Sequence, residues 1–118
     1  MPNINDFDRL YRRTVKELSG ATSPHYLKLG RVGAKKLRVL THVTVENTES
    51  AYDKVRLGVD AGGRIHYLDE LKDPAEDELA VSRSDILLGE GDVFFAELSG
   101  CGAGEPLILT VIGWEQDL

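Results

Sequence analysis

The chain has 118 residues, a hydrophobic fraction of 42% and a net charge of −6, values that suit a single soluble globular domain. The acidic balance argues against a nucleic-acid partner and against an anionic membrane surface, because both require a basic patch. No segment approaches the roughly 20 apolar residues of a transmembrane helix, and residues 1–20 lack the apolar core of a signal peptide.

Residues 3–18 are predicted to form an amphipathic helix. Their apolar side chains recur at spacings of three and four: Ile4, Phe7, Leu10, Tyr11, Val15 and Leu18. This spacing places them on one stripe of a helix, and Gly20 follows as a stop signal. We expect residues 1–22 to form an N-terminal arm that packs either on its own domain or on a neighbouring subunit.

Residues 23–118 carry a strand pattern and are expected to form a β domain. The clearest part is Lys54 to Leu71, where Val55, Leu57 and Val59 alternate with more polar residues or glycine. This is the period of a half-buried strand. Gly62 and Gly63 then lead into a second β-rich run, which predicts an antiparallel hairpin.

Six further strands and one loop are predicted. Two of the strands precede the hairpin and four follow it, and the acidic loop comes directly after the hairpin in the sequence. The strands lie near residues 26–33, 36–46, 79–81, 86–88, 93–98 and 107–114, and the loop covers 69–78. In the longest strand, one face is assigned to Leu37, Val39, Thr41, Val43 and Val45. The closing strand is apolar on nearly both faces, so we expect it at the centre of a sheet or at an interface.

About eight short strands without intervening helices favour a mainly β fold. We therefore expect an antiparallel two-sheet sandwich, jelly-roll-like, preceded by one N-terminal helix. An open sandwich of another topology is the alternative.

The residues that could carry chemistry do not form a known motif. His25, His42 and His66 each stand alone, without the one-residue spacing that places two imidazoles on one strand face, so no metal site is expected. The acidic residues between Asp69 and Glu78 lack the spacing of a calcium loop. Cys101 is the single cysteine, which excludes an intramolecular disulfide. We expect no catalytic residues, no cofactor and no enzymatic activity.

Four aromatic residues remain as candidates for recognition: Tyr26, Tyr52, Tyr67 and Trp114. They could stack on a sugar ring, or they could pack in the core or at a protein interface, where tyrosine and tryptophan are common. The first possibility corresponds to a small carbohydrate-binding module.

Segments 55–70 and 84–113 resemble small β-sandwich proteins of tailed-bacteriophage particles. The resemblance lies in Val-Arg-Leu-Gly-Val, Gly-Arg-Ile-His-Tyr-Leu-Asp-Glu, Asp-Ile-Leu-Leu-Gly-Glu-Gly-Asp and Leu-Ile-Leu-Thr-Val-Ile-Gly-Trp, and it covers roughly the C-terminal two thirds of the chain. It implies a structural component of the virion, assembled in the host cytoplasm. The protein would be a head decoration or cement protein, or a head–tail connector component.

The resemblance implies other virion proteins as partners, either the major capsid protein or a portal-proximal protein. The chain would be a homo-oligomer or lattice-bound, without nucleic acid or membrane. We expect the partner contacts at exposed apolar and aromatic residues: Ile4, Phe7, Leu10, Tyr11, Tyr52, Tyr67 and Trp114.

Overall fold

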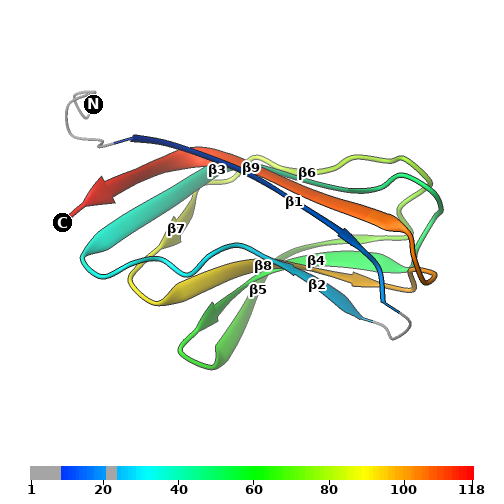
Figure 1. Cartoon of the computed structure of the whole chain (residues 1–118), viewed down its shortest axis with the longest axis horizontal. Coiled ribbons are helices and arrows are strands. Elements are labelled where there is room, and N and C mark those ends of the chain that lie inside the picture. Colours follow the sequence, from blue (N-terminus) through cyan, green and yellow to red (C-terminus); the bar gives the residue numbers. More distant parts are fainter. Residues whose placement is uncertain (1–8, 21–23) are drawn as a thin grey trace.

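The structure is a computed structural model that describes residues 9–20 and 24–118. Within these residues the chain forms nine β-strands and no helix. The strands make two antiparallel sheets that pack face to face (Figure 1). The two-sheet β-sandwich predicted from the sequence is therefore confirmed.

Sheet A contains five strands in the order β1-β9-β3-β6, and β7 also pairs with β3. Their bounds are Arg9–Leu18 for β1, Pro106–Asp117 for β9, Lys36–Asn47 for β3, Ala80–Ser82 for β6 and Ile86–Leu88 for β7. Strands β6 and β7 pair with successive parts of β3, so together they form one edge of the sheet. Strand β1 forms the other edge, and β9 lies inside the sheet, as its apolar sequence predicted.

Sheet B contains four strands in the order β2-β8-β4-β5. Their bounds are His25–Lys28 for β2, Asp92–Ser99 for β8, Lys54–Ala61 for β4 and Arg64–Lys72 for β5. The pairing is nested, because β1 pairs with β9, β2 with β8, β3 with β6 and β7, and β4 with β5. A long hairpin folded over in this way, with successive pairs in alternate sheets, is a jelly-roll arrangement.

The predicted hairpin is formed by β4 and β5. Ala61 pairs with Arg64, and Gly62 and Gly63 between them have φ angles of 63° and 95°. Two consecutive positive φ angles are typical of the type I′ turn, which glycine adopts without a steric penalty. Strand β5 continues to Lys72, so residues 69–72 of the predicted acidic loop belong to a strand.

The predicted N-terminal helix is wrong for residues 9–18, which form β1; residues 3–8 lie outside the described residues. Strand β1 pairs with β9 over ten residues, from Arg9 opposite Glu115 to Leu18 opposite Pro106. Apolar residues spaced by three and four fall on both faces of a strand, so the helical stripe is lost. The ten pairs with β9 connect residues 88 to 106 positions apart, and such long-range pairing overrides local helical preference.

The predicted faces of β3 hold for only half of the strand. Its register with β9 shifts between Leu40 and His42, which marks a β-bulge. One extra residue reverses the alternation of side chains on a strand. Arg38 and Leu40 therefore point inward before the bulge, and Val43 and Val45 after it.

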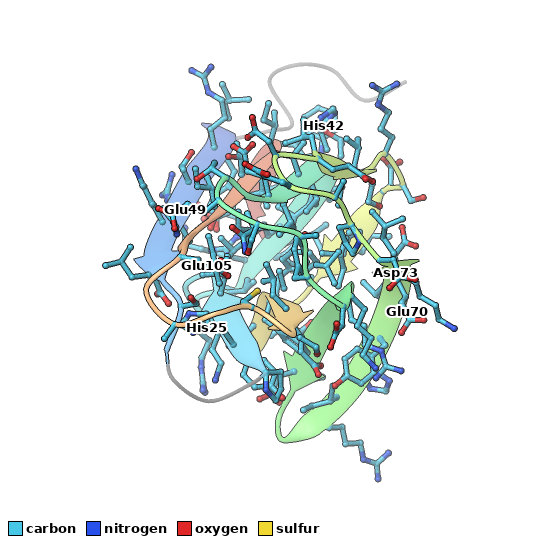
Figure 2. All side chains as sticks on the ribbon, turned by 90° about the vertical axis from the view of Figure 1, so that its right-hand side faces the viewer. His25, His42, Glu49, Glu70, Asp73 and Glu105 are labelled. Atoms are coloured by element: carbon cyan, nitrogen blue, oxygen red, sulfur yellow. The ribbon has the colours of Figure 1, made fainter. Side chains whose placement is uncertain are left out.

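The inner faces of both sheets supply the core. Its largest fully buried side chain is Phe94 on β8, and Leu98 on the same face is equally inaccessible. Seen along the strands, β1 and β2 lie on one side of the sandwich, and β5 lies with β6 and β7 on the opposite side (Figure 2). This arrangement leaves two outer sheet faces and two lateral sides for recognition.

Candidate functional site

The outer face of sheet A carries a row of apolar side chains that crosses four strands. Leu10 on β1 lies opposite Trp114 on β9, Trp114 opposite Val39 on β3, and Val39 opposite Leu87 on β7. We call these four residues the apolar row. Leu10 is 60% exposed and Leu87 68% exposed, whereas Val39 and Trp114 are half-buried. A contiguous apolar strip on a sheet surface is a typical protein-docking feature.

The neighbouring rows on this face are more polar. In the adjacent row, Ile112 on β9 lies between Arg12 on β1 and His42 on β3. In the row after it, Thr14, Thr110 and Thr44 lie opposite one another, and Val81 continues that row on β6. The apolar row itself lies toward the end of the sheet where β1 begins and β9 ends (Figure 1). Ile112 is 38% exposed and extends the apolar surface from Trp114 along β9.

The outer face of sheet B carries an aromatic cluster built around Phe95. Tyr26 packs edge-on against Phe95 with ring centroids 5.7 Å apart, and Tyr67 does so from the other side at 6.0 Å. A Cβ at Gly58 would lie 2.6 Å from the Phe95 ring, so the glycine makes room for this ring. Because both contacts are edge-on, neither tyrosine ring is coplanar with Phe95.

Polar groups of the aromatic cluster bind one another. The Tyr67 hydroxyl donates a hydrogen bond of 2.6 Å to the Glu97 carboxylate, which raises the pKa of Tyr67. The Arg56 guanidinium lies 4.5 Å above the Tyr67 ring and donates from Nε to Glu70 at 2.6 Å. The hydrogen bond from Arg56 lowers the pKa of Glu70. These groups therefore fix the cluster rather than point together at a vacant position.

A groove lies on the lateral side between β5 and the edge formed by β6 and β7. Two adjoining hollows of about 520 and 310 Å³ share Leu57, Asp69 and Ser82 in their walls, and we call them together the open-side groove. Val59 and Ile86 contribute further apolar surface. The carboxylates that line the groove are those of Asp69, Glu70, Glu78, Asp85 and Asp92. The groove therefore combines an apolar floor with an acidic lining.

The structure separates the residues predicted to contact partners. Leu10 and Trp114 lie opposite each other in the apolar row, and Tyr67 belongs to the aromatic cluster. Tyr11 and Tyr52 are core residues, 3% and 4% exposed. Ile4 and Phe7 lie outside the described residues. That these residues bind a partner stays a prediction.

Several surface residues could not be assigned from the sequence. The alternating pattern predicts Val39 on the same face as Val43 and Val45, because the bulge in β3 leaves no clear local signal. Leu87 is the middle residue of Ile-Leu-Leu, and the outward position follows from alternation once its neighbours are known to be buried. Phe95 follows Phe94 directly, so one of the two rings had to face outward.

The histidines lie on three different strands. The His25 ring contacts the Glu17 carboxylate at 3.0 Å, His42 lies on β3, and His66 lines the open-side groove. Figure 2 shows His25 and His42 far apart, on sheets B and A. Among the described residues, no three histidine, cysteine, aspartate or glutamate side chains are grouped as metal ligands would be.

Cys101 lies half-buried in the loop between β8 and β9. Burial raises the pKa of its thiol, which lowers the fraction of reactive thiolate at neutral pH. A nearby carboxylate, Glu105, accepts a hydrogen bond from the backbone N–H of Gly102 at 2.6 Å and also bonds the Ser50 hydroxyl. These contacts tie the loop to the β3–β4 connection, so the local network is structural.

Across residues 9–20 and 24–118, no helix is long and apolar enough to cross a membrane.

Comparison with known proteins gives a likeness of fold and no family. No family model matches the chain, and no curated protein matches it. The chain is similar to a solved structure described as an α-L-fucosidase from Bacteroides thetaiotaomicron, with 4% identity and a TM-score of 0.53. The match covers 83% of this chain and 21% of that protein, so the chain spans about a fifth of its length. At this identity, the likeness concerns the β-sandwich fold alone.

Two further structures give weaker matches. The core of Drosophila NLP matches with 16% identity and a TM-score of 0.42, over 90% of this chain and 96% of that chain. A structure of infectious bursal disease virus matches with 8% identity and a TM-score of 0.48, over 93% of this chain and 38% of that chain. Scores below 0.5 do not establish a common fold, and these matches assign no function.

Proposed function

We propose that this protein is a non-enzymatic structural component of a tailed-bacteriophage particle that attaches to the capsid shell as a decoration protein. The observation that carries the proposal is the apolar row on sheet A, because it offers a protein partner a continuous surface across four strands. The sequence resemblance to virion β-sandwich proteins supports the choice of partner. The protein would reside in the virion after assembly in the host cytoplasm.

The size of the row suits binding to a repeated lattice. Four side chains make a small contact, below what a tight one-to-one complex usually buries. A capsid shell presents the same site many times, and many copies together can cover it although each contact is weak. A head–tail connector component would use the same surface at a single vertex, so the two roles differ in copy number per particle.

The test is co-sedimentation of the purified protein with empty shells made of the major capsid protein of the same phage. We expect Leu10→Glu and Leu87→Glu, at opposite ends of the apolar row, each to weaken binding about tenfold or more, which corresponds to about 1.4 kcal/mol. Both side chains are exposed, so the fold should remain intact. The matched control is Ile65→Glu, at an exposed apolar position on β5 where the side chain is 50% accessible.

Unchanged binding of both row variants would overturn the role of the apolar row. Absence of wild-type binding at any concentration would overturn the decoration role. Saturation at a few copies per particle would favour the connector role, since a decoration protein should approach one copy for each lattice site.

The carbohydrate-binding alternative makes a different prediction for the same samples. A sugar stacking on Tyr26 or Tyr67 would change the tyrosine fluorescence. This change would be lost when the stacked tyrosine is replaced by alanine, in Tyr26→Ala or Tyr67→Ala, whereas Leu87→Glu would leave the change in place. The edge-on packing around Phe95 leads us to expect no such change.

A further inference from the structure

We infer that copies of this protein associate head to tail, with the β1 edge of one copy occupying the open-side groove of the next. The inference concerns a second copy of the chain and does not rest on the proposed role in a phage particle. It follows from two surfaces of opposite charge on opposite sides of one sandwich.

The two surfaces cannot meet within one molecule. Strand β1 is one edge of sheet A, and β6 and β7 form the other edge. In sheet B, β2 lies at the edge near β1, and β5 lies at the edge near the groove. The end-on view in Figure 2 shows this separation, with β1 and β2 on the left and β5 on the right.

The groove is suited to a basic, partly apolar strand. Its floor includes Leu57, Val59 and Ile86, which are core residues accessible from this side. Its walls carry the five carboxylates named above, of which Glu70 is paired with Arg56, and no lysine or arginine is among the residues that line it. An acidic lining over an apolar floor favours an occupant with positive charge between apolar side chains.

Strand β1 has this composition. Arg12 and Lys16 are exposed along it, between the exposed apolar side chains of Leu10 and Leu18 near its two ends. Arg13 is also exposed and lies over the Tyr11 ring at 4.5 Å. The charge of β1 is therefore opposite to that of the groove, although the whole chain is acidic.

Strand β1 also has backbone groups available for pairing. In the described part of the chain it pairs with β9 alone, so its other edge is not part of any ladder. An edge of ten residues is long, and unpaired strand edges commonly pair with another chain. Contact with the rim strand β5 of a second copy would supply such a partner.

The expected contact is heterologous, because it joins two different surfaces. Each copy uses its β1 edge once and its groove once, so repetition gives a closed ring or an open filament. The attraction between β1 and the groove is electrostatic, so salt should weaken the association.

The test uses the full chain in sedimentation-velocity experiments between about 1 and 500 µM, a range that covers weak, micromolar association. The β1 variant is Arg12→Glu with Lys16→Glu, which leaves the Arg13–Tyr11 contact intact. The groove variant is Asp69→Lys with Asp85→Lys. The control is Glu49→Lys with Glu76→Lys, which makes the same change of charge outside the residues that line the groove. Circular dichroism and the melting temperature confirm that each variant is folded.

We expect the wild type and the control to associate, and the β1 and groove variants each to sediment as monomers alone. A one-to-one mixture of the β1 and groove variants should associate again, because each then meets a surface of opposite charge. The inference would be overturned by a monomeric wild type at every concentration. It would also be overturned by groove-variant association equal to that of the wild type, or by a mixture that stays monomeric.

Discussion

Two groups of four residues, one beside the edge strand β1 and one beside the edge strand β5, contain the same residue types. On the β1 side, Tyr11 lies opposite Gly113, and Arg38 lies opposite Glu115 on neighbouring strands. On the β5 side, Tyr67 lies opposite Gly58, and Arg56 lies opposite Glu70. We call these the inner and the outer quartet.

The two quartets are close in geometry. Arg38 lies 4.1 Å from the Tyr11 ring, and Arg56 lies 4.5 Å from the Tyr67 ring. The ion pairs have similar lengths, 2.7 Å between Arg38 and Glu115 and 2.6 Å between Arg56 and Glu70. In each quartet, neighbouring atoms leave no room for a Cβ at the glycine opposite the tyrosine.

Burial separates the two quartets. Tyr11 is 3% exposed and Tyr67 45% exposed. The pKa of both phenols is raised, but burial is the main cause for Tyr11, and the hydrogen bond to Glu97 is the main cause for Tyr67. The same residue types therefore attach an edge strand to the core in one place and organise a surface in the other.

The largest difference is expected when the glutamates are neutralised. Arg38 and Glu115 are almost fully buried, and Arg38 also donates to the Gly30 carbonyl at 2.7 Å. Glu115→Gln leaves the Arg38 charge buried without its counter-charge, which should cost about 3–5 kcal/mol of unfolding free energy. Glu70→Gln is the matched change in the outer quartet, where solvent screens Arg56, and we expect a far smaller loss.

Urea unfolding of both variants, followed by circular dichroism, measures this difference. Equal shifts of the two midpoints would mean that the difference in burial does not change how much each ion pair contributes to the free energy of unfolding.

A second difference is expected at the glycines. A Cβ at Gly113 would lie 1.9 Å from the Val39 carbonyl oxygen, in the backbone of β3 next to the bulge. A Cβ at Gly58 would meet the far end of the Phe95 side chain at 2.6 Å, with the His66 carbonyl at 3.0 Å. A side chain can move more easily than a paired backbone, so Gly113→Ala should cost about 3 kcal/mol and Gly58→Ala about 1 kcal/mol.

Thermal unfolding of the two alanine variants gives the ranking. A larger loss for Gly58→Ala would show that Phe95 is held more rigidly than the β3 backbone.

The two quartets also show how far the sequence could predict this fold. The β4–β5 hairpin that holds the whole outer quartet was predictable, because its strands are adjacent and its turn residues are local signals. The inner quartet joins β1, β3 and β9, and its contacts depend on a register across about a hundred residues. Without β9, the apolar spacing in residues 10–18 fits a helix better than a strand, which explains the incorrect prediction.

The candidate surfaces were less predictable than the fold, for a related reason. Leu10, Trp114, Val39 and Leu87 form one row only after four strands have been placed side by side. The bulge between Leu40 and His42 puts Val39 on the outside, and nothing in the alternating pattern of this segment signals it. Leu10 and Trp114 could each be proposed from the sequence as partner-binding residues, but their position opposite each other on neighbouring strands could not.

The smallest expected effect concerns the pH dependence of the outer quartet. The hydrogen bond from Arg56 holds the pKa of Glu70 below its ordinary value of about 4.3. A carboxyl group with a lowered pKa in the folded state stabilises the fold above that ordinary value, and the contribution is lost as the pH falls through the folded-state pKa. The stability difference between the wild type and Glu70→Gln should therefore be present at pH 7 and disappear in acid.

Urea midpoints at pH 7, 5, 4 and 3 measure this difference, with Ile65→Ser on the same strand as a control without a titrating group. A difference that persists unchanged at pH 3 would show that Glu70 acts through packing, and the outer quartet would then resemble the inner one more closely than its exposure suggests.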